Sequence, residues 1–299
     1  MNKILMPLAF ILVRILSFLP LSVLRKMGDL LGSIGYKFAV SRRNVGIKNL
    51  SLCFPEMPED EKHRIIKAHF KCLLASVLEY SYVFYASRDK IKKIVTYKNI
   101  HYLDKHYGHK PIILLCPHFV GLDLAALRLT IDYIGFTLAF KQKNVYVNKM
   151  LIHARSRFMK NKGGEIFTRE RGLRPIIKKL RMDKQIFYYL PDQDFGEKDS
   201  LFVPFFSYPE CATISALPKL ALLSDAVIVP MVVYRRDHGY EIEFFENLEN
   251  YPTTNVENDV ILMNQFIEKV ALEHIDEYYW LHKRFKTQKG IVERGLIYK

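Results

Sequence analysis

The sequence predicts an α/β protein, with a mixed, mostly parallel sheet flanked by helices and an N-terminal membrane-anchoring helix. Short apolar or β-branched segments recur after residue 95, and segments with helical periodicity separate them. An apolar run at residues 4–24 precedes this alternation. No linker rich in Gly, Ser or Pro divides the rest. We therefore expect a membrane anchor over residues 1–26 and one domain over residues 27–299.

The apolar run has about the length that crosses a bilayer, but it contains a cation and two helix breakers. Arg14 lies in its middle, and Pro7 and Pro20 would kink or interrupt a helix. A charge at the bilayer centre is unfavourable, so a helix that lies in the interface is the alternative to a spanning one. Cations outnumber acids in the following segment, which places the downstream domain at the cytoplasmic membrane surface in either case.

A long amphipathic helix is expected after the anchor, because Pro58 and three acids form a favourable first turn. The apolar runs beyond it predict strands at residues 111–116, 136–140, 185–190, 226–234 and 240–245. Helical periodicity predicts helices at residues 122–133, 145–159, 173–182, 212–223 and 256–275. Pro218 inside the fourth of these predicts a kink or an earlier helix end.

Charge and motifs restrict the possible functions. Lys plus Arg number 45 against 31 Asp plus Glu, a formal charge of +14 that favours anionic partners such as phospholipid, phosphorylated substrate or an acidic protein. Four scattered cysteines fit no disulfide or zinc pattern. P-loop, GxGxxG, GxSxG and HExxH patterns are absent, as are patterns typical of nucleic-acid binding. We therefore expect no metal site, no cofactor and no nucleic-acid partner.

The stretch CPHFVGLDLAAL at residues 116–127 carries the strongest candidate for catalysis. His118 follows a predicted buried strand and precedes a predicted helix, and such strand ends are where open α/β sheets bind ligands. Five helical positions rotate a side chain by about 500°, or about 140° from the starting face. His118 and Asp123 can therefore meet only if the turn is not yet helical, and Gly121 would allow this. Asp123 would then orient the imidazole, which would act as a general base. The alternative is that His118 caps the helix and Asp123 pairs with a distant cation.

The HxxxxD pair and several other motifs resemble those of bacterial lipid A biosynthesis late acyltransferases, of the lauroyl or myristoyl transferase type. The resemblance covers nearly the whole chain in the expected order. It rests on RRNVGIKNLSLCFPE at residues 42–56, FTRERG at 167–172, LPDQDFG at 190–196, FVPFF at 202–206, AT at 212–213 and YWLHKRFKT at 279–287.

The resemblance implies an acyltransferase domain that moves a fatty acyl chain from acyl carrier protein to a hydroxyl of a Kdo-lipid IVA type precursor. It implies location at the inner membrane, with this domain on the cytoplasmic face. His118 would be the base and Asp123 its partner, and the family's substrate-site arginine matches Arg169. Asp192 and Asp194 end another predicted strand at the same sheet edge and are candidates for substrate binding. Arg169 could instead be an exposed ion-pair residue.

Two other readings stay open, and so do two local assignments. The HxxxxD pair also fits an acyltransferase that acts on a lysophospholipid or another glycolipid, and a third possibility is a non-catalytic basic membrane-surface protein. Cys116 is expected to be a core residue and not a nucleophile. In the YWLHKRFKT motif, Lys283, Arg284 and Lys286 are expected to face anions or, alternatively, solvent.

Overall fold

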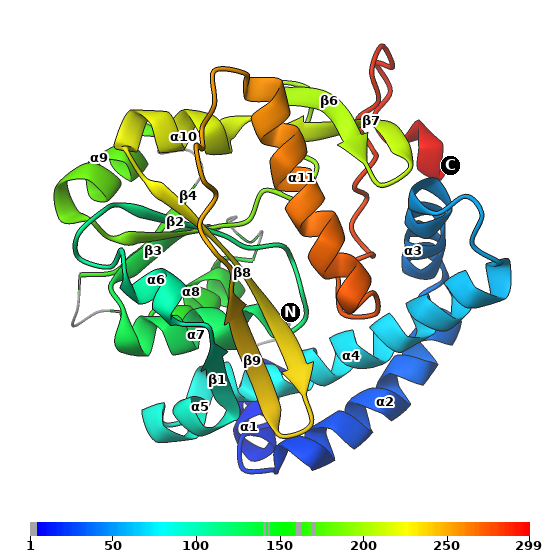
Figure 1. Ribbon diagram of the computed structural model, residues 1–299. Coiled ribbons are helices and arrows are strands. Elements are labelled where there is room, and N and C mark those ends of the chain that lie inside the picture. The colour runs from blue at the N-terminus through cyan, green and yellow to red at the C-terminus, as the bar shows by residue number, and fades with distance from the viewer. Residues whose placement is uncertain (1–4, 140–141, 143, 160–162, 169–171) are drawn as a thin grey trace.

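The protein is built around one seven-stranded sheet, shown in the computed structural model of Figure 1. The structure describes residues 5–139, 142, 144–159, 163–168 and 172–299. The strand order is β1-β9-β8-β2-β5-β3-β4. All neighbours are parallel except β8 and β9, so β1 and β9 run against the other five strands. The predicted fold class, a mixed and mostly parallel sheet flanked by helices, is therefore confirmed.

The central strands are nearly continuous runs of apolar residues, as expected for a sheet covered on both faces. All four residues of both β2 and β5 are buried. The strands of the sheet are β1 (Val95–Lys98), β2 (Ile112–Leu115), β3 (Gly135–Ala139), β4 (Glu165–Thr168), β5 (Ile186–Tyr189), β8 (Val227–Arg236) and β9 (Gly239–Phe244). A separate antiparallel hairpin consists of β6 (Ser200–Phe205) and β7 (Tyr208–Ile214).

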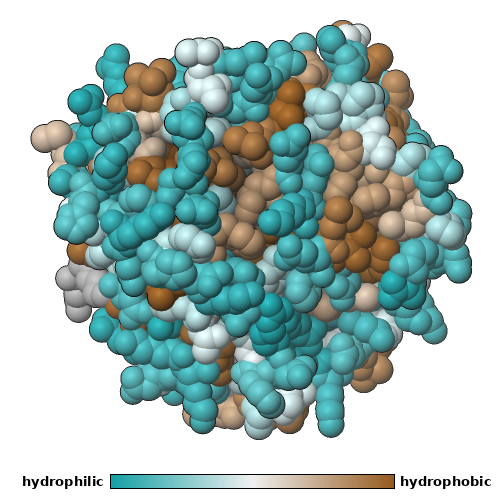
Figure 2. Space-filling model, in the orientation of Figure 1, coloured by the Kyte–Doolittle hydropathy of each residue, from teal (hydrophilic) through white to brown (hydrophobic). Residues whose placement is uncertain are grey.

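Helices pack in two groups around the sheet. The first contains α4 (Glu59–Tyr85), α5 (Arg88–Ile94), α7 (Leu122–Asp132) and α8 (Val145–Arg155). The second contains α9 (Arg174–Asp183), α10 (Ala216–Ser224) and α11 (Val256–Glu273), with α11 also against β6. The remaining elements are α1 (Leu5–Leu16), α2 (Leu21–Phe38), α3 (Val40–Cys53), α6 (His101–Asp104) and the 3-10 helix η3 (Leu296–Tyr298). Hydrophilic side chains predominate on the face drawn in Figure 2, with apolar patches in its middle, over the region of α11.

The five predicted strands, the long amphipathic helix and the five helices predicted after it all have counterparts. Two helix boundaries are wrong. The helix α8 ends at Arg155 and not at residue 159. Residues 212–214 belong to β7, and α10 begins only at Ala216. Pro218 lies in the first turn of α10, where its missing N–H leaves no helical hydrogen bond unmade. The helix continues past this proline to Ser224, so Pro218 does not end it early. The short strands β1 and β4 and the hairpin β6–β7 were not predicted.

The N-terminal segment forms two helices where one anchor was predicted. Pro20 separates α1 from α2, and α2 continues across the predicted boundary at residue 26. No helix in the described part of the chain is long and apolar enough to span a bilayer. In Figure 1, α2 runs alongside α4. Gly28 and Gly32 permit this close approach, since a Cβ on either would lie 2.4 Å from a Cα of α4. The segment formed by α1, α2 and their connection leaves apolar side chains exposed, among them Ile11, Leu12, Ile15, Phe18 and Leu30.

Candidate functional site

The position of His118 follows from the register between β2 and β5. Leu115 lies opposite Tyr189, and the Cys116 N–H continues the ladder by donating to the Tyr189 carbonyl at 3.0 Å. The same offset of residues, carried past the strand ends, brings His118 opposite Asp192. Both therefore lie at the carboxyl edge of the sheet, where the sequence analysis expected them.

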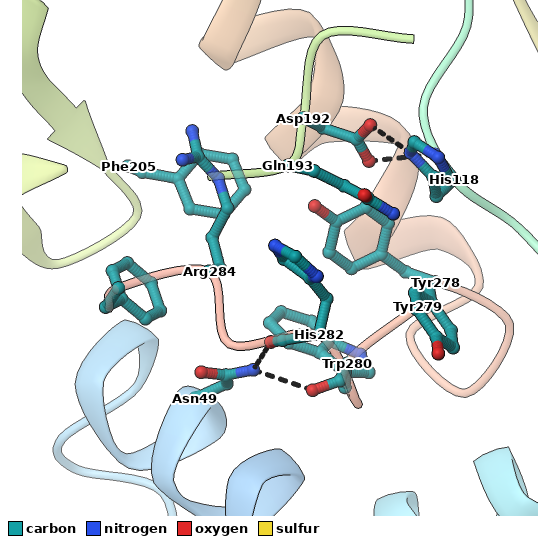
Figure 3. Close-up of a pocket in the computed structure, with 11 residues that line it drawn as sticks. Asn49, His118, Asp192, Gln193, Phe205, Tyr278, Tyr279, Trp280, His282 and Arg284 are labelled. Carbon is teal, nitrogen blue, oxygen red and sulfur yellow. Dashed lines mark hydrogen bonds and ion pairs between the residues drawn. The ribbon is translucent and has the colours of Figure 1, made fainter. Parts of the chain in front are cut away.

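His118 and Asp192 form a partly buried, two-point contact, drawn in Figure 3. The backbone N–H of His118 donates to Asp192 Oδ2 at 2.8 Å, and the ring atom Nδ1 lies 2.5 Å from Oδ1. Burial opposes ionisation of Asp192, but the adjacent His118 outweighs it and lowers the pKa of the carboxyl. An ionised Asp192 requires the proton on Nδ1, so the free lone pair of the neutral ring is on Nε2. Within the described part of the chain Nε2 has no partner, and the His118 side chain is 24% exposed.

Asp123 does not form the predicted hydrogen bond to His118. It is the second residue of α7, and Gly121, with φ of 82°, forms the turn before the helix. The Asp123 carboxylate instead contacts Arg155 of α8, whose Nε lies 2.7 Å from Oδ1 and whose Nη2 lies 3.0 Å from Oδ2. Because the helix has already begun at Asp123, its side chain is directed to a neighbouring helix. The expectation that Asp123 orients the imidazole by direct contact is therefore wrong.

His118 and Asp123 nevertheless share one large cavity. Its volume is about 880 Å³, and Arg155 also lines it. Most of its wall is apolar, with side chains from α4, α7, α9, α10 and the central strands. These include Leu73, Val77, Leu127, Leu138, Ile176 and Leu220. The arrangement places one imidazole and one guanidinium–carboxylate pair at the surface of a cavity suited to a long hydrocarbon chain.

The YWLHKRFKT segment and the residues just before it support the loop that carries His118. Val120 N–H donates to the Glu277 carbonyl at 3.0 Å, and Tyr279 N–H donates to the His118 carbonyl at 2.9 Å. Asn49 of α3 holds the segment in turn, because its amide donates to the carbonyls of Trp280 and His282. The loop of the candidate base is thus fixed by residues far along the chain, near its C-terminal end.

The expectation that Arg284 faces an external anion is wrong. Arg284 is only 4% exposed, and it donates to the Ala212 carbonyl at 2.6 Å and to Thr213 Oγ1 at 2.8 Å. Arg284, His118 and Asp192 line the same small pocket, drawn in Figure 3. His282 lies in the same region, and burial lowers its pKa to about 4, so the ring is neutral at pH 7. The buried Arg284 cation and the neutral His282 ring thus lie at the same small pocket as the Asp192 carboxylate.

Asp194 has protein partners that leave no room for the predicted substrate contact. It accepts from the backbone N–H of Thr287 at 2.7 Å, from Thr287 Oγ1 at 2.9 Å and from the N–H of Gly196 at 2.9 Å. Arg294 adds an ion pair at 2.8 Å. The side chain is buried and does not line the large cavity. This geometry ties the loop after β5 to the C-terminal segment.

The other predicted residues fall into three cases. Arg169 lies outside the described residues. Cys116 is fully buried, and burial raises the pKa of its thiol, as expected for a core residue and not for a nucleophile. Among the residues that the structure describes, no group of three or more His, Cys, Asp or Glu side chains is placed to hold a metal ion.

Sequence reasoning missed Arg155, the residue that contacts Asp123. It lies 32 positions away on another predicted helix, and no local spacing links the two. Tyr80 of α4 was missed for the same reason; its hydroxyl accepts from Arg155 Nε at 3.0 Å. Only the packing of α4, α7 and α8 brings these three side chains together.

Comparison with known proteins identifies one family over nearly the whole chain. Residues 2–287 match the model of the family described as bacterial lipid A biosynthesis acyltransferase. A lipid A biosynthesis acyltransferase of Haemophilus influenzae is 30% identical over 90% of this chain and 86% of its own length. The lipid A biosynthesis lauroyltransferase of Escherichia coli is 28% identical over 92% and 90%. Among solved structures, the 1-acyl-sn-glycerophosphate acyltransferase PlsC of Thermotoga maritima aligns at 14% identity and a TM-score of 0.38, over 84% of this chain and 97% of that one.

Proposed function

Because the chain belongs to the bacterial lipid A biosynthesis acyltransferase family, we propose that it moves a fatty acyl chain from acyl carrier protein to a hydroxyl of a phosphorylated, Kdo-lipid IVA type precursor. One observation carries the mechanism: His118, which is hydrogen-bonded to Asp192, lines an apolar cavity of about 880 Å³. The pair supplies a base, and the cavity supplies a place for the chain that is transferred.

In the proposed reaction His118 acts as the general base. Nε2 accepts the proton of the acceptor hydroxyl while the oxygen attacks the thioester carbonyl. Asp192 holds the ring by Nδ1 and stabilises the imidazolium that forms. Collapse of the tetrahedral intermediate expels the phosphopantetheine thiolate, which takes the proton from Nε2. The ester forms, the thioester breaks, and His118 returns to its neutral state.

The proposed role of Asp123 is to hold Arg155 at the cavity. The carboxylate makes two contacts with the guanidinium, so this cation keeps a fixed position beside the reacting atoms. A fixed cation and the backbone N–H groups at the start of α7 would stabilise the oxyanion of the tetrahedral intermediate. Asp123 thus stays in the proposed catalytic site as the partner of Arg155.

The same proposal includes the acyl donor, the acceptor and the location of the protein at the membrane. The formal charge of +14 favours docking of an acidic acyl carrier protein and binding of a phosphorylated acceptor, for which Arg169 remains a candidate contact. The exposed apolar side chains of α1, α2 and their connection, of which Phe18 is 70% exposed, suit a helix pair that lies in the interface of the inner membrane on its cytoplasmic face.

The test is an acyl-transfer assay with purified protein, acyl carrier protein loaded with chains of different length, and separate acceptors. We expect a mass increase of one acyl chain on the phosphorylated disaccharide acceptor and none on lysophosphatidic acid. His118→Ala should abolish it with the folded state unchanged by circular dichroism. Transfer to lysophosphatidic acid alone would contradict the assigned acceptor. Undiminished transfer by His118→Ala would contradict the assigned base.

A further inference from the structure

Four cations meet where α1, α4, α5 and α8 come together, on the side of the protein that carries the exposed apolar residues of α1. We call them the corner cluster: Arg14, Arg88, Lys90 and Arg157. Arg14 lies over the ring of Tyr85 at 4.8 Å, and Lys90 over that of Tyr82 at 3.9 Å. Arg88 and Arg157 both lie over the ring of Phe158, at 5.1 and 4.7 Å.

The cluster has no acidic partner among the residues that the structure describes. Burial alone lowers the pKa of Lys90 and of Arg157, and no carboxylate opposes this effect for either group. The Arg157 Nε is buried and makes no hydrogen bond to any residue that the structure describes. Partly buried cations without a counter-ion are unfavourable, and an anion that binds there would relieve this.

Capping of helix ends explains part of this arrangement, but not all of it. Arg157 Nη2 donates to the carbonyls of Tyr82 and Ala86 at the end of α4, at 3.2 and 3.0 Å. Lys90 Nζ donates to the Ser17 carbonyl after α1 at 3.0 Å. The negative end of a helix attracts cations in this way. These contacts use one of the three guanidinium nitrogens of Arg157, and its Nε has no partner in the described part of the chain. The Lys90 ammonium has donors left beyond its one bond to Ser17.

The position of the corner cluster relates it to the reaction. Its neighbours Val83 and Met159 line the large cavity, while Ile15 and Phe18, at the end of α1 and just after it, are exposed beside Arg14. A lipid that enters the cavity from the membrane with its chains along α1 would bring its head group to this corner. Phosphate is the anion that suits it, since guanidinium groups bind phosphate oxygens through paired hydrogen bonds.

We propose that the corner cluster binds a phosphate group, either of the phosphorylated acceptor or of an anionic phospholipid beside it. This inference rests on the proposed function where the source is the acceptor, and is independent of it where the source is a phospholipid. In both cases the phosphate replaces the missing carboxylate and leaves the His118–Asp192 pair free.

The test compares Lys90→Gln/Arg157→Gln with a control that loses the same charge at two exposed sites, Lys110→Gln/Lys178→Gln. The acceptor is supplied with two phosphates or with one. Four proteins are needed: the wild type, these two double variants and a third double variant, Arg14→Gln/Lys90→Gln. The third replaces two side chains that reach solvent, and it tests the proposal if the variant with Arg157→Gln does not fold. Sedimentation with phosphatidylcholine vesicles, with and without phosphatidylglycerol, forms the second arm.

If the acceptor is the source, the cluster variant should raise KM for the doubly phosphorylated acceptor by about tenfold or more, with kcat within about twofold of wild type. If a phospholipid is the source, KM should stay constant while the preference for phosphatidylglycerol vesicles is lost. Equal behaviour of the cluster variant and the charge-matched control in both arms would overturn the proposal. A wild-type protein that transfers no acyl chain would refute the proposed function, and the vesicle arm would still test the cluster.

Discussion

Replacing Asp192 with Asn tests the assignment of the catalytic pair most directly, because it keeps the size of the side chain and removes its charge. The amide oxygen of the new side chain can still accept from Nδ1 and hold the ring, although the amide NH2 then replaces the acceptor of the His118 backbone N–H. The imidazolium formed during the reaction, however, loses the carboxylate that lies 2.5 Å from its Nδ1. We therefore expect kcat to fall while KM stays nearly constant.

The size of this fall can be worked out from the geometry. Two unit charges whose centres lie about 4 Å apart interact by about 4 kcal/mol at the effective dielectric constant of about 20 that suits protein sites. Each 1.36 kcal/mol changes a rate tenfold, so kcat should fall by about 10³. Asp192 is only 3% exposed, and solvent screening should reduce this value little.

The assay measures kcat and KM for acyl transfer by the wild type, Asp192→Asn and Asp123→Asn under one set of conditions. Asp123→Asn weakens the contact with Arg155 without touching the imidazole, so its loss should be smaller. Circular dichroism and thermal unfolding confirm that each variant is folded. A fall of less than about tenfold in Asp192→Asn, together with a far larger fall in Asp123→Asn, would refute the assignment of Asp192 as the partner of the base.

Three further predictions concern stability. Gly121→Ala should destabilise the fold by about 2–4 kcal/mol in urea titrations, because a Cβ would lie 2.2 Å from the Tyr240 ring at a φ of 82°; an unchanged midpoint would contradict this. Burial lowers the pKa of His69 to about 4 in the folded protein, so the unfolded chain binds the proton of this histidine more tightly. The stabilising contribution of the neutral ring is complete above about pH 6.5, and we expect the free energy of unfolding to decrease by about 3 kcal/mol as the pH falls to about 4. The variant His69→Leu should lack this part of the pH dependence. Asn49→Ala should cost about 2 kcal/mol and speed amide exchange in residues 280–283, because two carbonyls lose their donor; equal exchange rates would argue against this support.

The sequence was sufficient to predict the elements that form the edge of the sheet. The apolar runs that became β2 and β5 are long enough to be recognised, and each is followed by a polar residue with possible chemistry. His118 and Asp192 could thus be assigned to the same edge. Strands β1, β4, β6 and β7 were missed because their buried residues are few or alternate irregularly, as the burial of β7 illustrates.

The partner of His118 could not be identified, because the sequence does not give the order of the strands. The HxxxxD spacing and the family resemblance predict Asp123 as the partner, whereas Asp192 makes the contact because β2 and β5 are neighbours in the sheet. Arg284 was misjudged for a related reason. A basic residue in a charged run is usually solvated, and only the tertiary structure shows that it is covered by the hairpin β6–β7.

The contacts of Glu277 and Tyr279 with the loop of His118 have a consequence for the synthesis of the protein. During translation every strand of the central sheet leaves the ribosome before these two residues do. His118 and all strands of the sheet can therefore have been synthesised while the loop of His118 still lacks the hydrogen bonds that hold it in place. A chain interrupted at residue 270 would contain the whole sheet and both members of the pair, and we would expect it to be inactive.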